Sequence, residues 1–115
     1  MNESIVYFIL DEYSNSVKIG YTTLKGLKKR IETLQIGTPN ELTLLGATWG
    51  DKKIEKNIHE KFHSLHIRGE WFEYTKEIEE FIAECWDFSI IESLEKKLLK
   101  KITNKSREVK YVKQF

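Results

Sequence analysis

The chain has 115 residues, of which 40% are hydrophobic and 32% charged, a composition typical of one small globular domain. No apolar run approaches the roughly 20 residues of a membrane span, and the N-terminus lacks a secretory signal pattern, so membrane insertion and export are not expected. The single Cys85 excludes an internal disulfide and a cysteine-rich zinc module. These features predict a cytoplasmic protein.

The formal net charge of +1 hides an uneven distribution along the chain. Residues 94–115 hold eight Lys and Arg against two Glu, which gives this segment a charge of +6 and leaves −5 for residues 1–93. A basic terminal segment is consistent with a nucleic-acid-binding arm or with a solvated helix end. Any polyanion bound by the acidic body must therefore be held by a local basic patch.

The first elements in chain order are two strands and a helix. Residues 5–10 and 17–22 are rich in β-branched and aromatic residues and flank a polar segment, a pattern that predicts an antiparallel hairpin. Thr23 can cap the helix that follows, and Gly37 ends it. The apolar stripe of this helix consists of Leu24, Leu27, Ile31 and Leu34.

The remaining elements alternate strands with helices. Residues 42–49 predict a third strand, and Asp51 is a good N-cap for a second helix. Residues 70–74 predict a short edge strand, Thr75 caps a third helix, and the Ser89-x-x-Glu92 spacing predicts a fourth helix. The order β-β-α-β-α-β-α-α indicates an α+β fold with an antiparallel sheet of about three strands. We expect one domain over residues 1–86 and a helical, basic extension over residues 87–115.

Five short motifs follow one another along residues 4–82. In order they are Val6-Tyr7, Lys18-Ile19-Gly20 followed by Tyr21-Thr22, a helix carrying Arg30, Glu55-x-x-x-His59, and Gly69-Glu70-Trp71-Phe72. This ordered set resembles the GIY-YIG nuclease superfamily, and more narrowly a phage-type branch in which the second motif reads K-I-G-x-T. The resemblance implies a metal-dependent endonuclease that hydrolyses DNA in the cytoplasm of a bacterial host.

The same resemblance implies roles for individual residues. Tyr7 corresponds to the tyrosine of the first motif, and Lys18 stands where the second motif usually has a tyrosine. Arg30 corresponds to the helix arginine and suits bidentate contact with the scissile phosphate. Glu55 corresponds to the acid that holds one Mg²⁺ or Mn²⁺, with Glu70 as the alternative principal ligand.

The general base is left open between two tyrosines. Because a lysine with a pKa near ~10.4 is a poor base, the role would fall on Tyr7 or Tyr21, with Lys18 or the metal lowering the tyrosine pKa and His59 moving the proton. Double-strand cleavage at a single site of this type would need a homodimer. The expected DNA-binding residues are Lys25, Lys28, Lys29, Arg68, Lys100 and Lys101.

Two other functions compete with this one. His59-Glu60-Lys61-Phe62-His63 matches the H-E-x-x-H motif of zinc metalloproteases, and His66 lies one turn further on. The chain is short for a protease, and matches of this length arise by chance in charged helices. The second alternative keeps the fold without the catalysis, as a nucleic-acid-binding or protein-interaction module.

Overall fold

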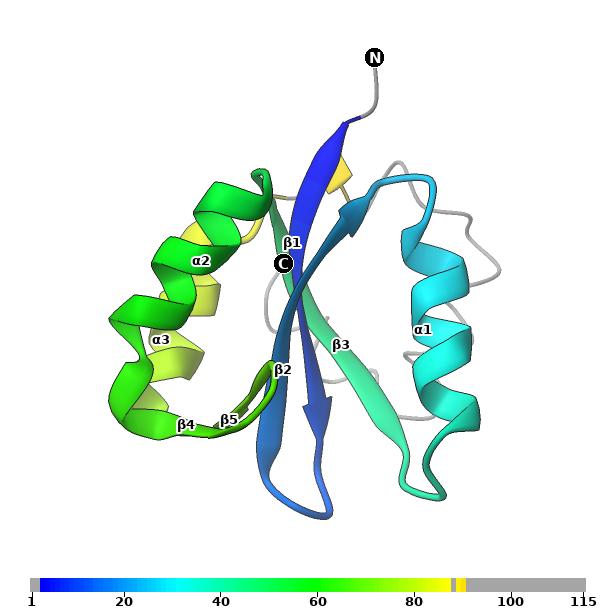
Figure 1. Cartoon of the computed structure of the whole chain (residues 1–115), viewed down its shortest axis with the longest axis vertical. Coiled ribbons are helices and arrows are strands. Elements are labelled where there is room, and N and C mark those ends of the chain that lie inside the picture. The colour runs from blue at the N-terminus through cyan, green and yellow to red at the C-terminus, as the bar shows by residue number, and fades with distance from the viewer. Residues whose placement is uncertain (1–2, 88, 91–115) are drawn as a thin grey trace.

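A computed structural model describes residues 3–87 and 89–90 of the chain. Within these residues five strands form one antiparallel sheet in the order β3-β1-β2-β5-β4, and three α-helices cover its two sides (Figure 1). The elements are β1 (Ser4–Asp11), β2 (Ser16–Thr23), α1 (Leu27–Ile36), β3 (Leu42–Trp49), α2 (Lys52–Lys61), a 3-10 turn (His63–Leu65), β4 (His66–Arg68), β5 (Trp71–Glu73) and α3 (Lys76–Cys85).

The expected α+β fold is confirmed, and so are its three long strands. Two strands of three residues each extend the sheet beyond the expected number of about three. β5 lies between β2 and β4, so the segment expected at the edge is an inner strand. β4 is the edge on that side, and all three of its residues are exposed.

Alternating residues of β1 divide the core into two layers. Ile5, Tyr7 and Ile9 face α1, whereas Val6 and Phe8 face α2 and α3. Each of these side chains is 0–1% exposed. β1 is therefore an inner strand that is buried on both faces and packs against helices on both sides of the sheet.

The helix caps explain where the helices begin. The side chains of Asp51 and Thr75 accept the backbone N–H three residues further on, at 3.0 and 3.4 Å, as expected of N-caps. The expected cap at Thr23 is wrong. Its hydroxyl accepts the Gly26 N–H at 3.0 Å within a turn, and α1 begins only at Leu27. Thr23 is the last residue of β2, so a turn separates it from the first residue of α1.

The predicted C-terminal extension falls mostly outside the part of the chain that the structure describes. Apart from residues 87, 89 and 90, the segment expected to form a fourth helix lies outside the described residues, and Lys100 and Lys101 lie there too. In the part of the chain that is described, no helix has the length and apolar character needed to cross a membrane.

Candidate functional site

The candidate site lies where β5 stops pairing with β2. β5 pairs with the first three residues of β2, and the Ile19 N–H then donates to the Glu70 carbonyl at 2.9 Å. Beyond this point, among the described residues, side chains and not a neighbouring strand bind the backbone carbonyls on this side of β2. His59 contacts the Ile19 carbonyl at 2.7 Å, and Arg30 donates to the Tyr21 carbonyl at 3.4 Å. Side chains from helices on opposite faces of the sheet thus contact the same edge of β2.

Tyr7 and Gly20 are directly opposed on β1 and β2, and the tyrosine ring lies over the glycine. A Cβ atom at position 20 would lie 2.4 Å from both Cζ and Oη of Tyr7, so no larger residue fits without displacing the ring. Arg30 Nη1 donates to Tyr7 Oη at 3.1 Å. The glycine of the second motif therefore positions the tyrosine of the first motif against the helix arginine.

The Tyr7 hydroxyl is kept in its neutral form. Burial raises the pKa of Tyr7, and the charges of Glu70 and Glu55 raise it further, while the hydrogen bond and charge of Arg30 act in the opposite direction. Lys18, expected to lower this pKa, is instead paired with Glu70. In this state Tyr7 accepts a hydrogen bond from Arg30 and retains its own proton for donation.

Lys18 forms an ion pair across the sheet. Its Nζ lies 2.9 Å from Glu70 Oε1 and 5.9 Å from the centre of the Trp71 ring. The lysine side chain is 14% exposed and the glutamate 39%. The Glu70 carbonyl also accepts the Ile19 N–H, so Glu70 is held both by its main chain and by its carboxylate. The lysine in the second motif therefore fixes the glutamate of the last one.

The carboxylate of Glu55 lies close to that of Glu70, the acidic member of this ion pair. Glu55 is only 8% exposed. Burial, followed by the charge of Glu70, raises its pKa, and the nearby His59 and Lys18 only partly oppose this effect. A pair of acids held together in this way fits a divalent cation such as Mg²⁺, which takes one or two carboxylates and keeps several waters.

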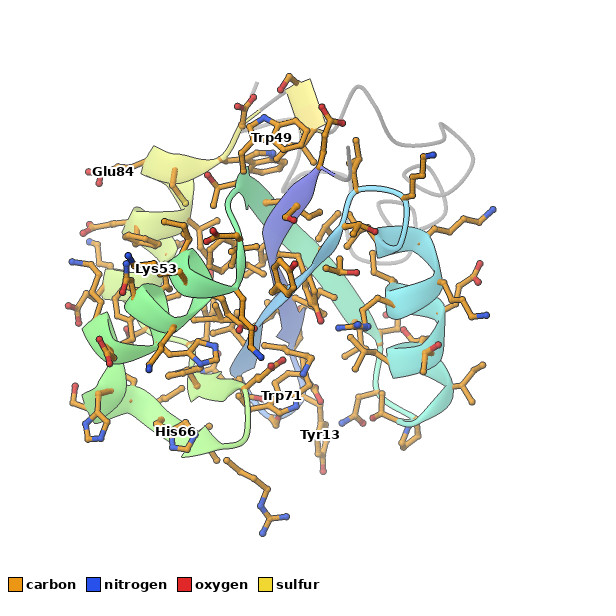
Figure 2. The ribbon with its side chains drawn as sticks, turned by 45° about the horizontal axis from the view of Figure 1, so that its top comes forward. Tyr13, Trp49, Lys53, His66, Trp71 and Glu84 are labelled. Atoms are coloured by element: carbon orange, nitrogen blue, oxygen red, sulfur yellow. The ribbon has the colours of Figure 1, made fainter. Side chains whose placement is uncertain are left out.

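An open pocket of about 670 Å³ lies over these carboxylates. Lys52 and Lys56 on α2 occupy positions three residues before Glu55 and three before His59, so all four share one helix face. This spacing is visible in the sequence, but the sequence interpretation missed the lysines. Figure 2 labels Lys53 on the same helix. The pocket is lined by Lys52, Lys53, Glu55, Lys56, His59, Gly69 and Glu70.

His59 is fixed by two contacts. A carbonyl oxygen can only accept, so the Nε2 atom bonded to Ile19 carries the proton, and a neutral ring keeps Nδ1 as its acceptor. The imidazole also packs against Phe72, with ring centres 4.9 Å apart. These two contacts therefore fix the orientation of the imidazole ring.

The H-E-x-x-H segment does not form a metal centre in the described residues. His59, Glu60, His63 and His66 line a smaller open pocket of about 320 Å³. The Nε2 atoms of His59 and His66 are bound to the carbonyls of Ile19 and Gly69, the latter at 2.8 Å. No group of three or more His, Cys, Asp or Glu side chains within residues 3–87 and 89–90 could hold a metal ion. This geometry disfavours the zinc interpretation.

Tyr21 is not brought together with Tyr7. It pairs with Val6 on β1, so its side chain lies on the opposite face of the sheet from the Tyr7 ring. The Tyr21 hydroxyl lies 3.5 Å from Ser4 Oγ. Its contribution to the site is the backbone carbonyl that accepts from Arg30.

The expected DNA-binding cations in the described residues lie at the surface. Lys25, Lys28 and Lys29 are exposed in and before α1, close in sequence to the exposed Arg30. Arg68 is exposed on β4. Three lysines of α2 line the pocket over the acidic pair, whereas Arg68 lines a separate pocket.

Residues 4–87 match the family model of the T5orf172 domain, and the chain therefore belongs to that family. It is a phage-associated domain of the GIY-YIG/HNH-like nuclease type, which indicates a nuclease-like or nucleic-acid-related role. A search of curated proteins and a search of solved structures found no match.

Proposed function

We propose that this T5orf172 domain is a divalent-cation-dependent endonuclease of the GIY-YIG type that hydrolyses DNA phosphodiester bonds at the edge of β2. The observation that carries the proposal is the meeting of Glu55 and Glu70 beside the hydrogen-bonded pair of Tyr7 and Arg30. Hydrolysis of a phosphodiester needs charge stabilisation on the phosphate oxygens, a positioned water and proton transfer. These residues provide groups for each requirement.

Arg30 would hold the phosphate, with the buried Tyr7 orienting its guanidinium. The exposed guanidinium is oriented by the Tyr7 hydroxyl and the Tyr21 carbonyl, so it is positioned before the substrate arrives. Because Tyr7 is 0% exposed, its neutral hydroxyl would act on the phosphate through Arg30, which it orients. In this role Tyr7 needs no lowered pKa. Its alternative role as general base would require the bound complex to lower that pKa.

Glu55 and Glu70 would hold the cation. A Mg²⁺ or Mn²⁺ ion bound there would act as a Lewis acid toward the phosphate and leaving oxygens. His59 borders the same pocket, and its Nδ1 can accept a proton from a water while Nε2 stays anchored to Ile19. Lys18 supports the site indirectly by fixing Glu70.

The alternative, a non-catalytic nucleic-acid-binding or protein-interaction module on this scaffold, also has a specific observation in its favour. Lys18 replaces a tyrosine of the family pattern, and its charge is matched by Glu70. Burial additionally disfavours ionisation of Tyr7. A scaffold retained only for binding would tolerate both features, so a cleavage assay must decide between the two.

The deciding experiment measures nicking of a supercoiled plasmid with Mg²⁺, with Mn²⁺ and with a chelator. The wild type should nick only with a divalent cation. Arg30→Ala should lower the rate by roughly 100-fold or more, because a lost donor to transition-state charge costs about that much. DNA affinity should fall far less. Lys76→Ala, an exposed cation at the start of α3, is the matched control and should behave like the wild type.

The opposite results would reject the proposal. A wild type that binds DNA but never nicks it under any of these conditions would favour the binding module. Cleavage that persists unchanged in Arg30→Ala would show that the active centre lies elsewhere.

The lysines of α2 should act through phosphate contacts. In the double variant Lys52→Gln/Lys56→Gln, two cations beside the pocket are lost while the helix is retained. If each binds one phosphate, the slope of log affinity against log salt should fall by about 2. Fluorescence anisotropy at four salt concentrations measures this slope. An unchanged slope would mean that the DNA does not pass over this helix face.

A further inference from the structure

A second pocket lies on the Tyr7 face of the sheet, beyond the candidate site. Ser16, Lys18 and Gly20 alternate along this face of β2, so the Ser16 end lies about 7 Å from Lys18 at the usual strand rise of ~3.4 Å per residue. The pocket at that end has a volume of about 570 Å³. It is lined by Asp11, Ser14, Ser16, Ile67, Arg68 and Trp71.

One wall of this pocket is aromatic and shared with the site. Trp71 is the cross-strand partner of Lys18, and the ammonium group of Lys18 lies 5.9 Å from the centre of its ring. The tryptophan is half-buried, so one part of it supports the core while another lines the pocket. The exposed Arg68 lies on the adjacent strand β4 and contributes a positive charge.

The opposite wall carries hydroxyl groups. Ser14 Oγ and Ser16 Oγ lie 2.6 Å apart, so one of the two hydroxyl protons is used between them and the other is available to a ligand. The Asp11 carboxylate is already engaged. Its Oδ1 accepts the N–H groups of Tyr13 and Ser14, and its Oδ2 accepts from Asn40 at 3.0 Å. Asp11 therefore shapes the hairpin turn.

We propose that this pocket binds an unstacked nucleobase of the DNA strand, about 14 Å along β2 from the scissile phosphate, since four residues at ~3.4 Å each separate Ser16 from Gly20. The inference rests on the proposed function, because it takes the phosphate to lie at Arg30 and Tyr7. An aromatic face stacks on any base, a hydroxyl contacts a base edge, and a guanidinium binds the flanking phosphate. A base inside an intact duplex cannot reach the Trp71 ring. The preferred substrate therefore has an unpaired nucleotide a short distance from the cleavage point.

The test measures binding of two labelled single strands by fluorescence anisotropy in the presence of a chelator. One is a 12-nucleotide oligothymidine, and the other has the same phosphates but no bases. The wild type should bind the base-containing strand at least about fivefold more tightly, the lower limit for stacking of one base. Trp71→Leu should remove this preference. Trp49→Leu is the matched control, since Trp49 lies at the opposite end of the sheet (Figure 2).

Every outcome decides the proposal. Equal affinity of the wild type for both strands, or a preference retained by folded Trp71→Leu, would overturn it. If Trp71→Leu fails to fold, Ser14→Ala replaces it. Loss of one hydrogen bond from this exposed turn should lower the preference about threefold, and an unchanged preference would reject the pocket. This binding assay does not depend on cleavage. If the wild type prefers the base-containing strand but shows no nicking in the plasmid assay, the nuclease proposal is rejected and the base-binding pocket is retained.

Discussion

Replacing Glu55 with glutamine should abolish divalent-dependent cleavage and at the same time stabilise the protein. Loss of a cation ligand should lower the rate by about three orders of magnitude, equivalent to about 4 kcal/mol of transition-state stabilisation. The gain in stability follows from the environment of Glu55, a buried carboxylate next to Glu70. A neutral amide removes both the burial cost and the repulsion, and such active-site changes typically add about 0.5–2 kcal/mol.

The stability gain should depend on pH in a defined direction. The pKa of Glu55 is raised in the folded protein above its ordinary value of 4.5. The fold therefore favours the protonated form of Glu55. As pH rises and this carboxyl ionises, the free energy of unfolding of the wild type falls. Glu55→Gln and the wild type should unfold at similar temperatures below pH 4.5. The variant should unfold at a higher temperature at neutral pH.

Thermal unfolding with and without Mg²⁺ or Mn²⁺ separates the two effects. The cation should raise the unfolding temperature of the wild type in a concentration-dependent manner and have little effect on Glu55→Gln. Glu60→Gln is the matched control, because this exposed glutamate lies on the same helix and is the base that the zinc interpretation requires. Its cleavage should equal that of the wild type. A Glu55→Gln protein less stable than the wild type at pH 7 would contradict this account.

Gly20→Ala should damage both the fold and the site with the addition of a single methyl group. The new Cβ would meet the ring of Tyr7 at 2.4 Å, and that ring is completely buried in the core layer between the sheet and α1. Overpacking of this kind costs about 1–3 kcal/mol. At about 4–8 °C per kcal/mol, the unfolding temperature should fall by at least several degrees. If the ring moves to relieve the contact, the hydrogen bond from Arg30 is lost and nicking should fall with it.

Gly37→Ala is the control for this change. Gly37 ends α1, its backbone is in an ordinary conformation for L-residues, and an added Cβ would meet only ordinary contacts at 3.6 Å. Differential scanning calorimetry and the nicking assay should therefore show near wild-type behaviour. If Gly20→Ala were as stable and active as Gly37→Ala, the ring of Tyr7 would not depend on the glycine beneath it.

The long elements of the fold could be predicted because each has a strong local pattern. The hairpin of β1 and β2 follows from two β-branched runs around a polar turn, and Asp51 and Thr75 start their helices as caps should. β4 has only three residues, all exposed, so no alternation of apolar residues could reveal it. The start of α1 was misplaced because the turn that precedes it holds Leu24, which continues the apolar spacing of the helix.

The site was predictable where its residues are close in sequence or opposed on the hairpin. Tyr7 and Gly20 meet because the register of two adjacent strands requires it. The pairing of Lys18 with Glu70 joins positions 52 residues apart, and only the docking of β5 on β2 brings them together. Sequence alone gives no measure of burial, so the resistance of Tyr7 to ionisation could not be foreseen.

The contacts of His59 and Arg30 with the carbonyls of β2 have a further consequence for solubility. A strand edge with unsatisfied backbone groups can pair with the edge of another molecule and so promote aggregation. On this side of β2, the described residues cover the open edge with these two side chains in place of a neighbouring strand. Selection against pairing at this edge would therefore act on the same two residues that border the candidate site.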